Sequence, residues 1–349
     1  MSAAPVTQQP EQEIARAARA LEQGLLVAFP TETVYGLGAD AANPAAVAAI
    51  YAAKGRPQDH PVIVHLAPDA ALAAWAKEIP AEAQQLADAF WPGPLTMILK
   101  RADHVPADVS GGQDTIGLRC PAHPVAIALL QAFRQGQGGV AAPSANKFGH
   151  VSPTTAQHVR DEFGEGAGSP LAMVLDGGAS EVGIESTIVD LSRLATHGPV
   201  LLRPGHISAD AIAAVIDRLP VAADSAAPRA SGTLESHYAP HTPVAMQESQ
   251  QLAATLAAAV AAGRKVALIH YSAFAAVPHA SVRLPASPAG FAHALYAALR
   301  SMDGSGAAVI LVEAPPNGPD WLGVNDRLRR AAHGSSGLVH GLLNREAPP

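Results

Sequence analysis

Cationic and imidazole side chains are concentrated between a predicted helix and a predicted strand, in the segment 50–66. Lys54 and Arg56 come at the end of the helix, and His60 and His65 follow them. Arg offers a planar fork of donors, Lys a point charge and His a further donor, so the set suits an anionic, phosphate-bearing ligand. Because a Lys-x-Arg pattern is also common in solvated loops, this segment alone does not decide between a ligand site and a plain loop.

A second polar cluster lies in the stretch VAAPSANKFGHVSPTT. Ser144 and Asn146 fall in the expected loop, and Ser152 is predicted to cap a helix that holds Pro153 in its first turn. A strand end followed by small polar residues and a helix N-terminus is a suitable position for a phosphate. His150 has no carboxylate or cysteine beside it at metal-ligand spacing, so we interpret it as an ordinary polar residue and not as a zinc ligand.

A third cluster, PTETVYGLG, follows a predicted buried strand at 25–29. The hydroxyls of Thr31, Thr33 and Tyr35 can hold a small polar molecule, and the two glycines allow the backbone to approach a ligand closely. The alternative interpretation is a glycine-rich turn without a ligand. The ligand interpretation of this cluster is favoured only if the fold places it near the other two polar clusters.

The elements that must position these clusters alternate between helix and strand, which predicts an α/β domain with its site at strand ends and loops. Asn43 as a cap, Pro44 in the first turn and Gly55 at the end mark the second helix. Ser186 begins one of the later strands, and Arg203 ends another. The predicted helices are 11–23, 44–54, 68–77, 80–90 and 124–133, and the predicted strands include 25–29, 62–66, 95–99 and 115–120.

The composition is typical of a globular protein with a sizeable core. The 349 residues are enough for two domains, and 48% of them are hydrophobic. No run of about 20 apolar residues occurs, so no membrane span is expected, and the N-terminal residues do not resemble a signal peptide. The single cysteine, Cys120, excludes an internal disulfide and is predicted to be a small buried side chain and not a nucleophile.

The charge distribution argues against a general nucleic-acid surface. The formal net charge is −7; residues 1–210 hold 13 Lys and Arg against 21 Asp and Glu, and residues 211–349 hold 10 against 9. The part that carries the polar clusters is therefore acidic on average. A local basic pocket is still compatible with this balance.

The chain is predicted to contain two domains. Residues 1–10 are expected to be a flexible N-terminus and residues 11–218 the larger domain. Residues 219–243 are rich in Ala, Pro, Ser and Gly, which is typical of a linker. Residues 244–349 are predicted to form a smaller α/β domain.

The smaller domain is predicted to have helices at 250–262, 289–302 and 320–332 and strands at 265–271 and 307–313. Its last helix places Trp321, Val324 and Leu328 on one face, which we interpret as core. Arg327, Arg329 and Arg330 form a basic tip that we interpret as a solvated helix face.

Seven motifs occur in a fixed order along the chain: PTETVYGLG, KGRP with HPVIVH, FWPGPLT, TIGLR, PSAN, ESTIVD and LLRPG. In this order and spacing they resemble the YrdC family, over about residues 11–220. The linker and the C-terminal part resemble the longer, two-domain members of that family, the threonylcarbamoyl-AMP synthases. The resemblance implies a YrdC-like twisted mixed sheet with helices, followed by a smaller Rossmann-like α/β domain.

The resemblance also implies an activity. The long members of the family join L-threonine, bicarbonate or CO2 and ATP into threonylcarbamoyl-AMP and release pyrophosphate, which is a nucleotidyltransferase reaction. The product feeds N6-threonylcarbamoyladenosine formation in tRNA through a threonylcarbamoyl transferase complex, so tRNA would be an indirect partner. Mg2+ is expected to arrive with the phosphates of ATP, without a protein-built metal site, and the cytoplasm is the expected location.

Individual residues are assigned by the same resemblance. The catalytic set falls on Lys54, Arg56, Ser144 and Asn146. The ATP-contacting positions fall on Arg56, His60, Thr115, Ser144, Ser152, Arg203 and, in a linker that folds over the site, Tyr238. The threonine-binding positions fall on Thr33, His65, Arg119, Ala142 and Ser186. His60 stands where many relatives carry Asn.

Elementary chemistry agrees with these roles. Arg119 can pair with the carboxylate of threonine, and Lys54 and Arg56 can neutralise charge on a transferring phosphate. No side chain is required as a general base, so positioning and electrostatics are expected to supply most of the rate. Two other functions remain as alternatives, an RNA-binding module without ATP turnover and a carbamoyl transferase of the hydrogenase-maturation type; the latter would need a zinc finger, for which one cysteine is too few.

Overall fold

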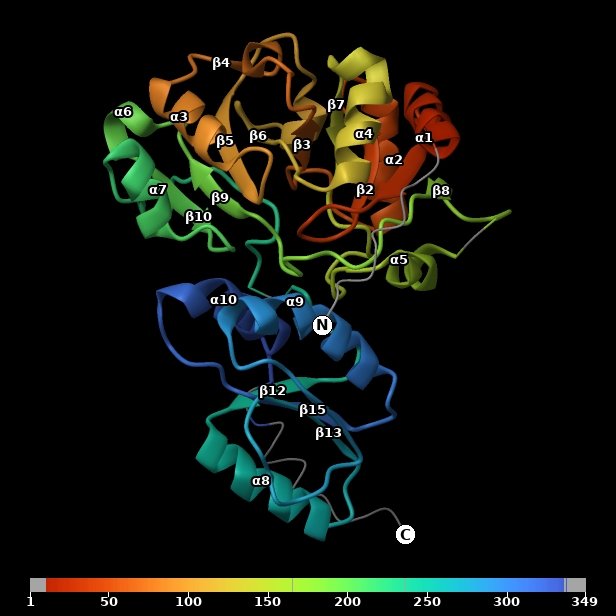
Figure 1. Ribbon diagram of the computed structural model, residues 1–349, viewed down its shortest axis with the longest axis vertical. Coiled ribbons are helices and arrows are strands. Elements are labelled where there is room, and N and C mark those ends of the chain that lie inside the picture. The colour runs from red at the N-terminus through yellow and green to blue at the C-terminus, as the bar shows by residue number, and fades with distance from the viewer. Residues whose placement is uncertain (1–10, 165, 236, 336, 338–349) are drawn as a thin grey trace. The chain divides into compact units, whose positions relative to one another are not determined.

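Two compact units make up the chain in the computed structural model, which describes residues 11–164, 166–235, 237–335 and 337 (Figure 1). The first unit comprises Met1–Phe148 and Ser152–Thr233, and the second comprises Gly149–Val151 and Leu234–Pro349. The division falls inside the segment expected to be a linker. Each unit has its own sheet and is described separately.

The first unit is built on one mixed sheet, in which the described residues form eleven strands. The strand order is β11-β10-β9-β5-β6-β3-β7-β2-β1-β8, and β4 pairs with β5 beside this path. β3 is parallel to β6 and antiparallel to β7, so the sheet is mixed, as expected. The strands are β1 (Leu26–Phe29), β2 (Gly36–Asp40), β3 (Ile63–Leu66), β4 (Ala76–Lys77), β5 (Leu95–Arg101), β6 (Thr115–Arg119), β7 (Gly139–Ala141), β8 (Leu171–Val174), β9 (Thr187–Asp190), β10 (Val200–Arg203) and β11 (Val221–Ala222).

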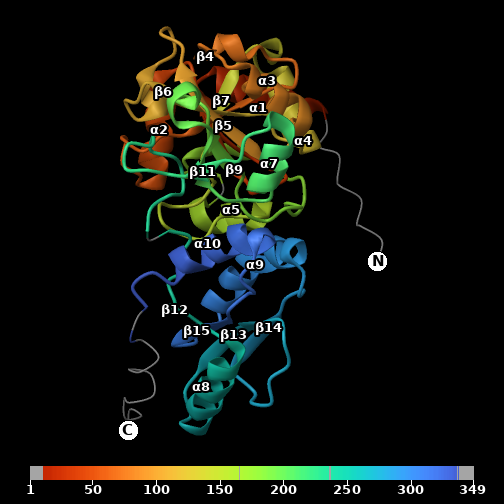
Figure 2. The same cartoon turned by 90° about the vertical axis from the view of Figure 1, so that its left-hand side faces the viewer.

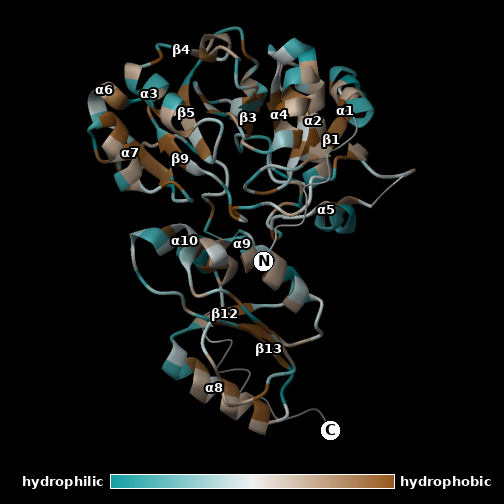
Figure 3. Ribbon diagram, in the orientation of Figure 1, coloured by the Kyte–Doolittle hydropathy of each residue, from teal (hydrophilic) through white to brown (hydrophobic). Residues whose placement is uncertain are grey.

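Helices cover both faces of this sheet. Successive strand residues point to opposite faces; Val27 and Phe29 therefore pack with α1 and α4, whereas Leu26 and Ala28 belong to the core beneath α2 and α3. Hydrophobic residues, drawn in brown, accordingly lie on strands such as β9 and on the sides of the helices that face the sheet (Figure 3). The helices are α1 (Glu11–Glu22), α2 (Pro44–Lys54), α3 (Ala81–Phe90), α4 (Pro124–Ala132), α5 (Ala156–Phe163), α6 (Leu194–His197) and α7 (Ala209–Ile216), with 3-10 turns at Leu72–Ala74, Ala107–Ser110 and Phe133–Gly136.

The glycines of PTETVYGLG serve packing inside the sheet. Gly36 and Gly38 lie in β2, which pairs antiparallel with β1. A Cβ on Gly38 would lie 2.8 Å from the ring of Phe29 and 2.9 Å from Val140. The loop between β1 and β2, residues 30–35, carries the hydroxyls, so the turn interpretation holds for the first part of the stretch and is wrong for the second.

The segment 68–77, predicted as a helix, contains only one 3-10 turn. It continues as β4, whose Ala76 pairs with Arg101 of β5. Trp75 is buried, and a Cβ on Gly139 would lie 2.4 Å from its indole ring. Strand pairing and the burial of this indole therefore outweigh the helix propensity of the surrounding alanines.

The helix predicted to start at Ser152 starts later. α5 begins at Ala156 with Thr155 as its cap, whose hydroxyl accepts a hydrogen bond from the backbone N–H of His158. The Ser152 hydroxyl donates instead to the Glu185 carboxylate at 2.5 Å. The prediction was wrong because it counted only local capping partners, whereas Ser152 finds its acceptor far along the chain.

The second unit is a Rossmann-like domain with one parallel sheet. The strand order is β12-β15-β13-β14, and all three pairings are parallel. α8 covers one face, with Leu252 and Leu256 in the core, and α9 and α10 cover the other face (Figure 2). The elements are β12 (Val244–Gln247), α8 (Ser249–Ala261), β13 (Val266–His270), β14 (Ala280–Arg283), α9 (Pro288–Asp303), β15 (Val309–Glu313), a 3-10 turn (Pro319–Trp321) and α10 (Leu322–Ala331).

Most of the predicted helices are present, including α1 to α4, α8, α9 and α10. The strands β12 and β14 were not predicted; each has only four residues. No helix in the described part of the chain is long and apolar enough to cross a membrane.

Arg327 of α10 is buried, which contradicts the prediction that it belongs to a solvated face. Its exposed fraction is 0%, whereas that of the Arg329 side chain is 70%. The Arg327 guanidinium pairs with the carboxylate of Asp326 at 3.0 Å and lies over the ring of Tyr238, 5.4 Å from its centre. Trp321, Val324 and Leu328, predicted as core, are all buried.

We expect Arg327→Ala to lower the free energy of unfolding by about 3 kcal/mol, because it removes a buried ion-pair partner and the packing on Tyr238. Arg329→Ala is the matched control, two residues away and exposed, and should change it by less than about 0.5 kcal/mol. Chemical denaturation of the full chain measures both. Equal effects of the two substitutions would contradict the burial of Arg327.

Candidate active site

Lys54 is the last residue of α2 and is directed into the protein. The helix ends there because Gly55 adopts a left-handed conformation, with φ of 64°. The Lys54 Nζ atom donates to the carbonyl oxygen of Ser144 at 2.6 Å and to that of Asn146. Burial, reinforced by the Arg56 charge, holds the pKa of Lys54 well below its usual value. Two of the predicted clusters are thus joined through one buried amine.

Two arginines meet at one serine of the predicted linker. Arg56 Nη2 donates to the Pro61 carbonyl oxygen at 2.7 Å and lies 3.5 Å from the Ser231 hydroxyl. Arg203 Nη1 donates to the Ser231 carbonyl oxygen at 2.8 Å, and its Nε donates to the Ser186 carbonyl oxygen at 3.0 Å. Both guanidinium groups are more than nine-tenths buried. Positive charge from distant parts of the chain is therefore concentrated here.

A second centre lies where β3 and β6 end side by side. His65 and Arg119 are partners in this parallel pairing. Arg119 Nη2 donates to Glu32 Oε1 at 2.6 Å, and its Nε donates to the Gly93 carbonyl oxygen at 3.3 Å. The exposed fractions of the two side chains are 5% and 7%, so this is a buried ion pair. Glu32 was not among the predicted site residues.

His65 is neutral in this setting. Burial, together with the charge of Arg119, lowers its pKa to about 3. Its ring meets that of Phe29 edge-on at 6.1 Å, and Nδ1 has no partner of good hydrogen-bond geometry in the described part of the chain. A neutral imidazole carries one donor and one acceptor nitrogen and adds no charge to the site.

The hydroxyl of Thr33 is available as an acceptor. Thr31 Oγ1 donates its only proton to the Val34 carbonyl oxygen at 2.6 Å. Thr33 Oγ1 lies 2.8 Å from Thr31 Oγ1, so the proton between them must come from Thr33. The Thr33 hydroxyl can therefore act toward a third group only as an acceptor, for example from an ammonium or a hydroxyl group.

Ser186 ends a loop that reaches both centres, since the Val182 N–H of this loop donates to the Glu32 carbonyl oxygen at 2.7 Å. The Ser186 hydroxyl accepts from Arg203 Nη2 at 3.1 Å and lies 2.8 Å from the hydroxyl of Thr96, a buried residue of β5 that was not predicted. Ala142, at the end of β7, donates its backbone N–H to the Ile63 carbonyl oxygen at 2.9 Å. Five of the predicted residues therefore lie on adjoining strand ends and loops of one sheet: Thr33, His65, Arg119, Ala142 and Ser186.

Three predicted nucleotide contacts are less closely connected. His60 lies edge-on to Phe148, whose backbone N–H donates to the Lys54 carbonyl oxygen. Thr115 lies at the opposite end of β6 from Arg119, paired with Lys100. Tyr238 belongs to the second unit. The structure thus joins most of the predicted set through the first sheet and leaves these positions at its margins or outside that unit.

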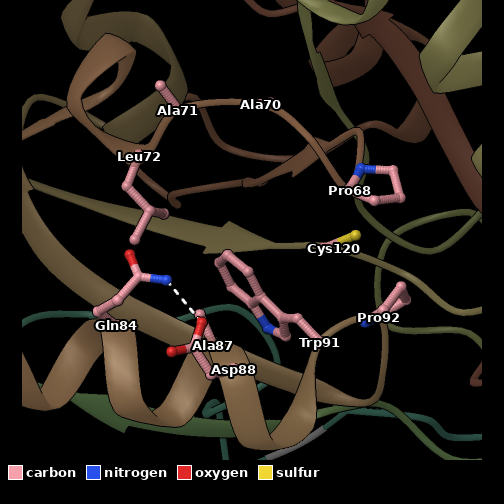
Figure 4. Close-up of a pocket in the computed structure, with 10 residues that line it drawn as sticks. All are labelled: Pro68, Ala70, Ala71, Leu72, Gln84, Ala87, Asp88, Trp91, Pro92 and Cys120. Carbon is pink, nitrogen blue, oxygen red and sulfur yellow. Dashed lines mark hydrogen bonds between the residues drawn. The ribbon is translucent and has the colours of Figure 1, made fainter.

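A separate pocket of about 420 Å³ lies between α3 and the loop after β3 (Figure 4). Trp91, Leu72 and Cys120 line it, and Asp88 at its side accepts a hydrogen bond from Gln84 at 2.7 Å. No predicted site residue contributes to it. The Cys120 thiol is buried, and burial raises its pKa to about 12, which agrees with a packing role and not with a nucleophile.

Comparison with known proteins identifies the family of the chain. A family model described as "Telomere recombination", covering the Sua5, YciO and YrdC proteins, matches residues 19–205. The chain belongs to this family. A second model, described as the C-terminal domain of threonylcarbamoyl-AMP synthase, matches residues 207–333 of this Sua5/YrdC-family chain. The resemblance inferred from the seven motifs is confirmed.

Relatives of the chain match over almost its whole length. A threonylcarbamoyl-AMP synthase of Pyrococcus abyssi is 39% identical over 92% of this chain and 94% of its own. One of Bacillus subtilis is 38% identical over 92% of this chain and 93% of its own. The crystal structure of P. abyssi Sua5 complexed with L-threonine is 38% identical, with a TM-score of 0.83 over 93% of this chain and 95% of that one.

Glu32, Thr96 and Ser231 are the polar residues of the site that the sequence analysis missed. Glu32 lies inside PTETVYGLG, so a carboxylate beside three hydroxyl-bearing residues was a visible signal. Ser231 had no such signal, because it lies in a segment interpreted as linker. Thr96 is one hydroxyl within an apolar strand and is equally common in ordinary cores.

The low pKa of His65 predicts acid sensitivity. An unfolded histidine has a pKa of about 6.5, so between pH 6.5 and 3 the unfolded state binds a proton that the folded state does not. Stability should therefore be unaffected above pH 6.5 and fall below it, by up to about 1.4 kcal/mol per pH unit from this residue. Below pH 6.5, the free energy of unfolding of His65→Gln should fall less steeply with decreasing pH than that of the wild type. His206 is exposed, so His206→Gln is the control and should show the wild-type slope. Chemical denaturation at a series of pH values measures both.

Proposed function

We propose that the chain is a threonylcarbamoyl-AMP synthase, an enzyme that condenses L-threonine, bicarbonate or CO2 and ATP and releases pyrophosphate. Two relatives that bear this name, those of Pyrococcus abyssi and Bacillus subtilis, each match the chain over 92% of its length. The observation that carries the proposal is the pair of buried centres, one around Arg119 and His65 and one around Lys54 and Arg56; the loop 182–186 reaches both, through Glu32 at one end and Arg203 at the other. One suits an amino acid, and the other suits a polyphosphate.

The amino-acid centre offers complementary groups for threonine. The guanidinium of Arg119 keeps N–H groups beyond those that bind Glu32 and Gly93, and these suit the α-carboxylate. Thr33 offers an acceptor for the ammonium or the side-chain hydroxyl. His65, neutral and buried, adds a polar atom without adding charge. The match of P. abyssi Sua5 complexed with L-threonine supports this choice of amino acid.

The cationic centre suits the phosphates of ATP. Lys54, Arg56 and Arg203 donate to carbonyl and hydroxyl oxygens here, and phosphate oxygens can replace such acceptors. Ser144, Asn146, Ser152, His60 and Thr115 stay predicted contacts. No cluster of three metal-ligating side chains occurs in the part of the chain that the structure describes. We therefore propose that Mg2+ is held mainly by the phosphates, where it would neutralise their charge.

The chemistry then needs little from individual side chains. The neutral amine of threonine attacks CO2, the N–C bond forms and the amine proton is lost to solvent. The resulting carbamate oxygen attacks the α-phosphorus, the bond to the β-phosphate oxygen breaks and pyrophosphate leaves. Lys54 and Arg56 stabilise the charge on the departing phosphates, while Arg119 holds the nucleophile in place.

Tyr238 remains a proposed nucleotide contact. It has a φ of 61°, in the left-handed region, and its ring lies 5.7 Å from that of Tyr296. A residue other than glycine keeps such a conformation only where its surroundings fix it. This supports a defined role for the segment beyond that of a spacer, in line with a linker that closes over bound nucleotide.

The product is a mixed anhydride that must be used before water cleaves it. We propose that it passes to a threonylcarbamoyl transferase complex that modifies tRNA, and that the chain acts in the cytoplasm without reading tRNA itself. The RNA-binding alternative predicts tRNA binding that weakens steeply with salt, without ATP turnover. The carbamoyl transferase alternative predicts turnover with carbamoyl phosphate in place of threonine.

Pyrophosphate release tests the proposal. The full chain is incubated with ATP, Mg2+ and bicarbonate, with L-threonine, with glycine or with neither. Release that requires threonine and is absent with glycine is the expected result. Release that is independent of threonine, or no release in any mixture, would contradict it.

We expect Lys54→Ala and Arg56→Ala each to lower threonine-dependent pyrophosphate release by about 100-fold to 1,000-fold, the effect of removing one charged donor from a transferring group. Lys77→Ala is the matched control, since Lys77 is a partly exposed lysine paired with Asp103, and should keep wild-type release. Thermal unfolding of each variant separates loss of chemistry from loss of fold. Wild-type release by the folded Lys54 and Arg56 variants would show that the mechanism is wrong.

A further inference from the structure

Glu32 is the partner of Arg119 in the amino-acid centre, and neither the sequence analysis nor the proposed function assigns it a role. Its Oε1 accepts from Arg119 Nη2 at 2.6 Å, and its Oε2 accepts from the backbone N–H of Ala122 at 3.0 Å. Both side chains are almost completely buried. A charged bond between groups that water cannot reach holds its geometry far better than one on the surface.

Glu32 is itself fixed on three sides. Ala122 lies just before α4, so one carboxylate oxygen is tied to the start of that helix. The backbone carbonyl oxygen of Glu32 accepts from the Val182 N–H at 2.7 Å, in the loop that leads to Ser186. The residue therefore connects the loop after β1, the start of α4 and the Ser186 loop. These bonds restrict the movement of the Glu32 carboxylate. The Arg119 guanidinium that pairs with it is therefore held in one position.

The remaining donors of Arg119 are arranged for a second anion. An arginine has five N–H groups. In the structure, Nε donates to the Gly93 carbonyl oxygen and one Nη2 proton goes to Glu32. The Nη1 group of Arg119 has no partner among the residues that the structure describes. Glu32 and Gly93 thus fix one edge of the guanidinium plane and leave the other edge for a carboxylate.

The surroundings agree with a ligand carboxylate at that free edge. His65 is the strand partner of Arg119, and its imidazole is buried beside the guanidinium. Thr33, next to Glu32 in sequence, gives its hydroxyl proton to Thr31, so its oxygen can only accept from a further group. An acceptor, a neutral imidazole and a fixed guanidinium edge together match a zwitterionic amino acid.

We propose that Glu32 is a positioning residue for the amino-acid substrate: it fixes the guanidinium plane of Arg119 so that the free edge binds the α-carboxylate. This inference rests on the proposed function. It assigns Glu32 no proton transfer, because both carboxylate oxygens accept hydrogen bonds and one is paired with a full positive charge. The role is to orient threonine, and ATP binding is independent of it.

Glu32→Gln is the first test, because glutamine keeps the size and one acceptor but removes the charge. The KM for threonine is expected to rise about 10-fold to 100-fold, which corresponds to the loss of a charge-assisted bond that orients the site. The KM for ATP should stay within about twofold of wild type. Equilibrium dialysis of labelled threonine without ATP should show the same loss. An unchanged threonine KM, or an equal rise in both KM values, overturns the proposal.

Asp40→Asn is the matched control. Asp40 is a buried carboxylate at the end of β2 that pairs with Arg134 and is not one of the predicted site residues. Its loss should lower the thermal midpoint and leave the KM for threonine unchanged. A purely structural role for Glu32 would make the two variants alike, which is the result that contradicts the proposal. If Glu32→Gln lacks a native thermal transition, Glu32→Asp replaces it: the carboxylate is kept but drawn back by one methylene, so the guanidinium loses its fixed position. The KM for threonine should then rise with the KM for ATP unchanged, and an unchanged threonine KM or an equal rise in both overturns the proposal.

Arg119→Lys separates action through Arg119 from direct contact. If Glu32 acts only by positioning the guanidinium, adding Glu32→Gln to Arg119→Lys should weaken threonine binding by less than about twofold further. If the double variant instead weakened threonine binding by the product of the two single effects, Glu32 would act independently of Arg119 and the proposal would be overturned. The proposed function fails by a different result, absence of threonine-dependent pyrophosphate release by the wild-type protein, so the two failures are distinguishable.

Discussion

The buried ammonium of Lys54 is the constraint on which the cationic centre depends. An ammonium that leaves water must donate hydrogen bonds, and here the carbonyl oxygens of Ser144 and Asn146 receive them. This requirement fixes how the loop after β7 bends relative to the end of α2. Because Gly55 ends the helix directly after Lys54, Arg56 is brought into the same region. One buried charge thereby determines the relative position of two segments about 90 residues apart.

The two centres differ in their charge balance, and the proposed assignment of substrates rests on this difference. Around Lys54, the cations donate to neutral oxygens such as those of Ser144 and Ser231, which phosphate oxygens can replace. Around Arg119, the charge is already paired with Glu32. A zwitterion adds no net charge to such a pair, whereas a polyphosphate would leave it strongly negative. Ser186 bonds to Arg203 and follows the loop tied to Glu32, so the two environments adjoin.

Local signals were sufficient for much of the fold and failed where long-range partners decide. α2 was predicted correctly because Asn43, Pro44 and Gly55 act within a few residues. The Ser152 helix start was wrong, since a distant Glu185 takes the hydroxyl. The same holds for Trp75, whose burial favours β4 over a helix.

The sequence by itself determined the family, the alternation of helix and strand, and which residue types the site contains, because these follow from motifs and from periodic burial. Only the tertiary structure decided that Glu32 pairs with Arg119, that Ser231 meets two arginines, and that Arg327 is buried against Tyr238. A charged residue has the same local propensity whether it faces solvent or a buried partner. Its partner is chosen by the packing of distant segments, and a local pattern does not contain that information.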